Sequence, residues 1–115
     1  MTRGDIYWAD IAPRSGSEQQ GHRPAIIISH NIFNQSASWR SLIVVPITTS
    51  ATQAKRGPTV VRLPVGTGGL GQDSVALCHQ ITTLDRNKLT AKTGILPDHF
   101  LRKVEDALKA ATDLP

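Results

Sequence analysis

Five short apolar runs, separated by loops rich in glycine, proline, serine and threonine, constrain the fold of this chain more than any other feature. The runs span residues 5–10, 25–28, 42–47, 59–63 and 74–78, and each contains valine or isoleucine. Short β-branched segments between turn residues are typical of a compact β-rich domain. Since 115 residues support one modest core, we predict a single domain, built as a small antiparallel barrel or curled sheet.

Individual residues in these segments predict how the strands are arranged. Ala25 and three isoleucines follow one another without alternation, so residues 25–28 should form a central strand that is buried on both faces. Pro46 has no backbone N–H, which predicts that its strand lies at a sheet edge or carries a bulge at its end. The stretch at residues 66–71 is not followed by Lys-Ser or Lys-Thr. We interpret it as a flexible hairpin connection rather than a phosphate-binding loop.

The C-terminal segment changes to a helical period. Pro97 suits the first turn of a helix, and Asp98 is favourable near the positive end of the helix dipole. An apolar stripe at helical spacing follows, formed by Leu101, Val104, Leu108 and Ala111. We therefore predict a C-terminal helix that closes the barrel with this stripe.

Composition limits the partners and the compartment. Lysine and arginine number 13 and aspartate and glutamate 9, so the net charge of +4 permits an anionic partner such as nucleic acid. Cys78 is the one cysteine, which excludes an intramolecular disulfide and predicts a cytoplasmic protein with a thiol packed in its core. The N-terminus lacks a signal-peptide pattern, and no apolar run approaches the ~20 residues that cross a bilayer, so we expect no membrane contact.

Metal chemistry is not predicted. The four histidines, His22, His30, His79 and His99, do not stand at the spacings of metal ligands, and the sequence has no CxxC pair. We therefore expect neither a metal nor another cofactor.

A polar segment bracketed by glycines, residues 16–24, leads into the strand at Ala25. Arg23 stands at the strand entrance, where a fixed backbone can aim its guanidinium, and the fork of donors matches a phosphate. Glu18 could orient that guanidinium or accept a proton; alternatively, the two form a surface ion pair worth about 0–1 kcal/mol. Thr48 ends another strand, where its hydroxyl could cap a turn or bind phosphate or ribose oxygens.

Residues 16–28, GSEQQGHRPAIII, resemble the MazF/PemK family of toxin endoribonucleases. The likeness continues, in order, through residues 3–10 (RGDIYWAD), 44–50 (VVPITTS) and 73–85 (DSVALCHQITTLD), and it is closer to the MazF branch. It implies an SH3-like barrel of the CcdB/PemK type with a C-terminal helix. It also implies a homodimer that cuts single-stranded RNA at short sequence motifs. The implied partner is a cognate antitoxin that neutralises the toxin with an acidic, extended C-terminal segment.

The resemblance assigns roles to particular residues. Arg23 and Thr48 fall on the MazF catalytic pair, and Glu18 falls on a third residue implicated in some members. Gln19 and Gln80 fall on positions near the RNA groove.

The chain departs from the PemK branch of the family. Where that branch has His, Arg and Asp, this chain has Ser17, Leu77 and His79, so the resemblance favours an Arg–Thr mechanism. His79 could then lie on the RNA-binding face, take part in acid–base chemistry, or lie on the dimer face. Lys55 and Arg56 could contact the RNA backbone or remain in a solvated loop.

Without a metal, the accessible reaction uses the 2′-hydroxyl of RNA as the nucleophile and leaves 2′,3′-cyclic phosphate and 5′-hydroxyl ends. Arg23 suits stabilisation of the phosphoryl charge, and Thr48 suits positioning of the phosphate. The general base stays open: Glu18 is the first candidate, and His79 or His22 the second. A non-catalytic gyrase inhibitor with the same fold is the alternative function.

Overall fold

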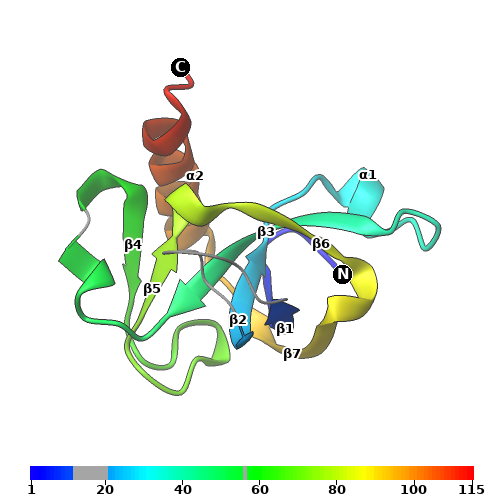
Figure 1. Ribbon diagram of the computed structural model, residues 1–115, viewed down its shortest axis with the longest axis horizontal. Coiled ribbons are helices and arrows are strands. Elements are labelled where there is room, and N and C mark those ends of the chain that lie inside the picture. Colours follow the sequence, from blue (N-terminus) through cyan, green and yellow to red (C-terminus); the bar gives the residue numbers. More distant parts are fainter. Residues whose placement is uncertain (12–20, 56) are drawn as a thin grey trace.

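The computed structural model describes residues 1–11, 21–55 and 57–115. In this part of the chain the strands are β1 (Asp5–Ile11), β2 (Gly21–Ile27), β3 (Ser41–Thr48), β4 (Val60–Leu63), β5 (Ser74–Leu77), β6 (Thr82–Asp85) and β7 (Leu89–Ile95), and the helices are α1 (Asn31–Asn34) and α2 (Asp98–Thr112). The strands form one curled sheet in the order β4–β5–β3–β2–β1–β7, with β6 paired to β3 (Figure 1). Every pairing is antiparallel, so the predicted fold class is confirmed.

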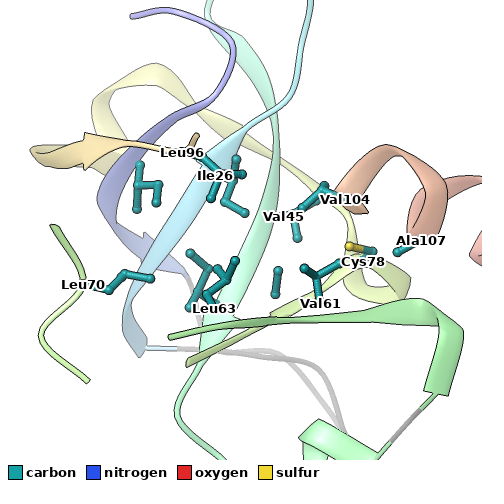
Figure 2. Close-up of a cluster of buried hydrophobic side chains, with 12 residues drawn as sticks. Ile26, Val45, Val61, Leu63, Leu70, Cys78, Leu96, Val104 and Ala107 are labelled. Atoms are coloured by element: carbon teal, nitrogen blue, oxygen red, sulfur yellow. The ribbon is translucent and has the colours of Figure 1, made fainter. Parts of the chain in front are cut away.

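Strand β2 is buried on both of its faces, as its unbroken apolar sequence predicts. Ala25, Ile26 and Ile27 are all 0% exposed. Ile26 packs in the cluster that includes Val104 of α2 (Figure 2), whereas Ala25 and Ile27 pack in a second cluster. Because successive side chains of a strand point to opposite faces, β2 separates two apolar layers and has little freedom to move.

Strand β3 lies in the middle of the sheet. Of the two alternatives predicted from Pro46, a sheet edge or a bulge at the end of the strand, the edge position is therefore wrong. On one side it pairs with β2, and on the other with β6 over residues 41–44 and with β5 over residues 47–48. Between these two partners, Val45 and Pro46 stand against residues 77–81, which include the 3-10 turn Cys78–Gln80. A proline is accommodated here because the ladder is already interrupted at this point.

Helix α2 covers one apolar cluster, as predicted. Pro97 is its N-cap residue and Asp98 lies in its first turn. Val104 and Ala107 are buried, and Cys78 packs in the same cluster (Figure 2). Cys78 is completely buried, which raises the pKa of its thiol to about 12. The prediction of a packed, unreactive core thiol is therefore confirmed. Among the described residues, no helix has the length and apolar character needed to cross a membrane.

Residues 66–71, which we call the glycine loop, connect β4 to β5, but they are packed against β7 rather than free. The Thr93 hydroxyl of β7 donates a hydrogen bond to the Gly68 carbonyl oxygen (2.9 Å). A Cβ atom at Gly69 would overlap the Thr93 carbonyl, and one at Gly94 would overlap the Gly68 carbonyl. Since β4 and β7 stand at opposite ends of the strand order, this contact closes the curled sheet.

Three elements were not expected from the sequence. Strand β6 is separated from β5 by the 3-10 turn Cys78–Gln80 and pairs with β3. Strand β7 has mostly exposed or partly exposed residues and no apolar run. Helix α1 is a single turn, which the His30 side chain caps by accepting a hydrogen bond from the Ile32 amide (3.0 Å), and the Arg86 guanidinium donates a hydrogen bond to the carbonyl oxygen of its last residue. Local sequence patterns do not record such long-range contacts.

Candidate active site

Arg23 and Thr48 meet at one end of the sheet. The β2–β3 register pairs Ala25 with Pro46, and continuing it by two residues brings Arg23 opposite Thr48. Both line a cleft of about 310 Å³. The sequence separates these residues widely, and the antiparallel pairing of two central strands brings them together.

Thr48 is held rigidly, and its side chain is 5% exposed. It is the last residue of β3 and pairs with Val75 of β5. Its hydroxyl oxygen accepts a hydrogen bond from the Ser50 amide at 3.3 Å. A hydroxyl that accepts in this way still has its own hydrogen to donate, so Thr48 can bind an anionic oxygen.

A stacked aromatic pair forms part of the same cleft. The Trp8 and His22 rings are 4.9 Å apart between centroids and almost parallel, at 5°. The Nδ1 atom of His22 lies 2.8 Å from Oδ1 of Asp10. Strands β1 and β2 fix this arrangement, because their register pairs Asp10 directly with His22 and Trp8 with Pro24.

The glycine loop and its neighbours supply the opposite wall of the cleft. Gly69, Leu70 and Gly71 contribute to it, together with Ser74 and Thr93. No sequence motif predicts that these residues belong to a site. These residues reach the cleft because the glycine loop closes the sheet. That closure joins residues far apart in the chain, so local sequence patterns do not reveal it.

A second hollow of about 340 Å³ adjoins the cleft and shares Thr49 and Ser74 with it. Arg62 and Asp73 bring charged groups to this hollow, and Ala54 of the 3-10 turn Gln53–Lys55 lines it from the loop after β3. The two hollows are therefore contiguous, which suits a substrate longer than one nucleotide.

Of the other predicted site residues, those that the structure describes, Lys55, His79 and Gln80, do not line the cleft. Lys55 is exposed on its 3-10 turn next to the second hollow. His79 and Gln80 lie in the turn between β5 and β6, which packs against α2, and they are not among the described residues that line the cleft. Three further predicted residues, Glu18, Gln19 and Arg56, lie outside the described residues, as does Ser17.

The described part of the site offers donors for an anion. Arg23 supplies a guanidinium and Thr48 a hydroxyl, and His22 brings an imidazole to the same cleft. Among the described residues, no three histidine, cysteine or acidic side chains are grouped as metal ligands. The arrangement is suited to binding a phosphodiester and moving a proton near it.

Comparisons with known proteins identify the family. The family model described as "PemK-like, MazF-like toxin of type II toxin-antitoxin system" matches residues 2–112. The chain therefore belongs to this family of toxins, as its sequence motifs predict.

Individual relatives agree in sequence and in fold. "Endoribonuclease EndoA" of Bacillus subtilis is 40% identical over 114 residues, which cover 99% of this chain and 96% of that protein. The crystal structure of MazF from Deinococcus radiodurans matches with a TM-score of 0.80 at 27% identity, covering 98% of this chain and 96% of that one. A mycobacterial endoribonuclease in complex with its cognate antitoxin has the same fold, with a TM-score of 0.80 at 23% identity over 100% and 97% of the two chains.

Proposed function

We propose that this protein is the toxin of a type II toxin–antitoxin system and an endoribonuclease that cleaves single-stranded messenger RNA at short sequence motifs without a metal. Cleavage leaves 2′,3′-cyclic phosphate and 5′-hydroxyl ends, and it stops translation and growth in the cytoplasm. One observation carries the proposal: Arg23 and Thr48 share a cleft in a chain of the PemK-like, MazF-like family. The name of the Bacillus subtilis relative supports the activity.

The chemistry follows from the groups at the cleft. The 2′-hydroxyl of RNA loses its proton to a base, the 2′-oxygen bonds to phosphorus, and the bond from phosphorus to the 5′-oxygen breaks. That oxygen takes a proton from water. Arg23 stabilises the negative charge that develops on the phosphoryl oxygens, since a guanidinium stays protonated at neutral pH. Thr48 donates a hydrogen bond that positions the phosphate for attack.

Contacts beyond the scissile phosphate extend along the two hollows. Lys55, beside the second hollow, and Arg56 next to it would hold the RNA backbone electrostatically, so binding weakens as salt rises. His79 and Gln80 would contact the RNA farther from the cleft, where it crosses toward a second subunit, and Gln19 would contact the RNA as the family resemblance implies.

The proposed assembly is a homodimer that a cognate antitoxin neutralises. Ile43 of β3 and Ile81, just before β6, are both exposed, and β3 pairs with β6 next to them, with Ile43 opposite Thr83. This apolar pair supports a dimer face. The net charge of +4 supports an acidic, extended C-terminal segment of the antitoxin as the neutralising element, and the antitoxin-bound mycobacterial neighbour supports such a partner.

The proposal is tested by incubating the purified protein with a long single-stranded RNA in the presence of EDTA. We expect cuts at a few short motifs, cyclic phosphate on the upstream fragments and no cleavage of the matching DNA, which has no 2′-hydroxyl. Intact RNA under these conditions would contradict the proposal. Gyrase inhibition without RNA cleavage would instead identify a non-catalytic toxin.

A further inference from the structure

The hydrogen bond between Asp10 and His22 sets the tautomer of the neutral imidazole. Asp10 Oδ1 and His22 Nδ1 are 2.8 Å apart, and an ionised carboxylate can only accept. The hydrogen of the neutral ring is therefore on Nδ1, and the lone pair is on Nε2. This is the protonation pattern that a histidine needs to accept a proton from a substrate.

The indole of Trp8 fixes the plane of the same ring. The two rings are almost parallel, at 5°, with centroids 4.9 Å apart. The hydrogen bond to Asp10 stops rotation of the imidazole about its own axis, and the stack stops it from swinging away from β1. Two contacts from one neighbouring strand thus hold the exposed His22 ring in a single orientation.

His22 and Arg23 reach the cleft from different sides. They are consecutive residues of β2, so their side chains leave opposite faces of the strand, and both line the cleft at the end of the sheet. Removal of the 2′-proton and stabilisation of the phosphoryl charge take place at different atoms of one nucleotide. The alternation of β2 therefore places a base and a charge-stabilising group on two sides of the same phosphate.

We propose that His22 is the general base of the cleavage reaction and that Asp10 and Trp8 are its positioning residues. This inference rests on the RNA cleavage proposed above. Nε2 of His22 accepts the proton of the 2′-hydroxyl as the 2′-oxygen bonds to phosphorus and the 5′-oxygen departs. The imidazolium that forms keeps its bond to the Asp10 carboxylate and then returns its proton to water.

The charged groups near His22 define the expected pH dependence. Asp10 faces it from β1, and Arg23 is its neighbour on β2. The other described residues that line the cleft, from β3, the glycine loop and β7, are not ionisable. A general base acts only in its unprotonated form. Cleavage by the wild-type protein should therefore fall at acid pH, where the imidazole carries a proton.

The first test measures kcat/KM against pH for wild-type, His22→Ala and Asp10→Asn proteins on one RNA. We expect His22→Ala to lower the rate roughly 10²–10⁴-fold, the usual contribution of a general base, and to remove the acid limb of the profile. Asp10→Asn should lower the rate less and keep the limb. His99→Ala, an exposed histidine on α2, should match the wild type. Circular dichroism checks that each variant is folded.

The second test separates a base from an acid. The substrate is the same RNA with sulfur in place of the 5′-bridging oxygen, a leaving group that needs no proton. If His22 is the base, His22→Ala should cleave this substrate more slowly than the wild type does. If His22 is an acid, the two rates should be equal, and this result would overturn the inference. A His22→Ala variant that cleaves RNA at the wild-type rate would also overturn the inference. So would a pH profile whose acid limb is lost in Glu18→Gln but kept in His22→Ala. Failure of the wild type to cleave RNA would instead refute the proposed function itself.

Discussion

The two walls of the cleft are built in different ways. One wall consists of side chains from β1 and β2, and its groups contact one another across a single pair of strands, as Asp10 and His22 do at 2.8 Å. The other wall is the glycine loop, which contributes mostly backbone and is held by its contact with β7. The first wall carries chemical groups, whereas the second supplies shape and closes the sheet.

This difference predicts that the two walls respond differently to substitution. The exposed side chains of Trp8, Asp10 and His22 can be changed with little loss of core packing, because the buried Ala9 and Ile11 of β1 point to the opposite face of the strand. The glycine loop cannot gain even a methyl group at some positions without moving β7. Changes in the first wall should therefore alter activity, and changes in the second should alter stability.

The largest expected effect is the loss of activity on changing Arg23 to Ala. Removing a charge-stabilising donor from the site should lower kcat roughly 10²–10³-fold or more, while the melting temperature stays close to that of the wild type. Cleavage of a labelled RNA measures the rate, and calorimetry measures the fold. Arg102→Ala, which removes an exposed arginine from α2, is the matched control. Wild-type cleavage by Arg23→Ala would show that this wall does not carry the chemistry.

The next effect concerns the other wall, where Gly69→Ala should destabilise the protein. Gly69 has a φ of 81°, and a Cβ there would overlap the Thr93 carbonyl. We expect the free energy of unfolding to fall by about 2–3 kcal/mol from backbone strain and overpacking. Gly71→Ala, with no atom within 4 Å of the new Cβ, should change it by at most about 0.5 kcal/mol. Equal urea midpoints for the two variants would contradict the contact with β7.

A smaller effect is expected for Thr48→Val, which keeps the branched shape and removes the hydroxyl. The loss of one hydrogen bond to a charged oxygen, worth about 1.5 kcal/mol, should lower kcat about tenfold. Because the Ser50 amide also loses its acceptor, the loop after β3 should show faster hydrogen exchange. A slower reaction with unchanged KM would support a role in the transition state, and a rise in KM alone would assign Thr48 to binding only.

The smallest effect lies outside both walls, at Asp85. A hydrogen bond from the Arg40 guanidinium, supported by the Asn87 amide, lowers the pKa of the Asp85 carboxyl below its ordinary 3.8. The ionised form therefore stabilises the fold above about pH 4, and this contribution is lost as the pH falls through the lowered pKa. Wild type should melt slightly above Asp85→Asn at pH 6, and the difference should shrink as the pH falls through the lowered pKa. A difference that does not shrink on acidification, or a change in RNA cleavage, would contradict this account.

Local patterns predicted those parts of the fold that depend on nearby residues. The unbroken isoleucines of β2 predicted its burial, and the apolar stripe of α2 predicted the helix. The edge position, one of the two alternatives predicted from Pro46, was wrong because the hydrogen-bond ladder of β3 is interrupted opposite residues 77–81. The sequence of β3 itself contains no sign of this interruption. Strand β7 was missed since its mostly exposed or partly exposed residues form no apolar run.

The site was predicted unevenly for the same reason. Arg23 and Thr48 were selected from their strand ends and from the family resemblance, and the β2–β3 register brings them together. The orientation of His22 depends on Asp10 and Trp8 in another predicted strand. The sequence does not show that this strand pairs with the strand of His22. The wall formed by the glycine loop depends on the contact with Thr93. Only the closed sheet of the folded structure reveals this contact.

The closure of the sheet by the glycine loop also has a consequence for synthesis on the ribosome. A nascent chain translated through β3 already contains Arg23 and Thr48, but the opposite wall requires Gly69 and its contact with Thr93 on β7. Translation must therefore pass Thr93 before the cleft can form. Until β7 has been synthesised and paired, the nascent chain carries Arg23 and Thr48 without the cleft that they share.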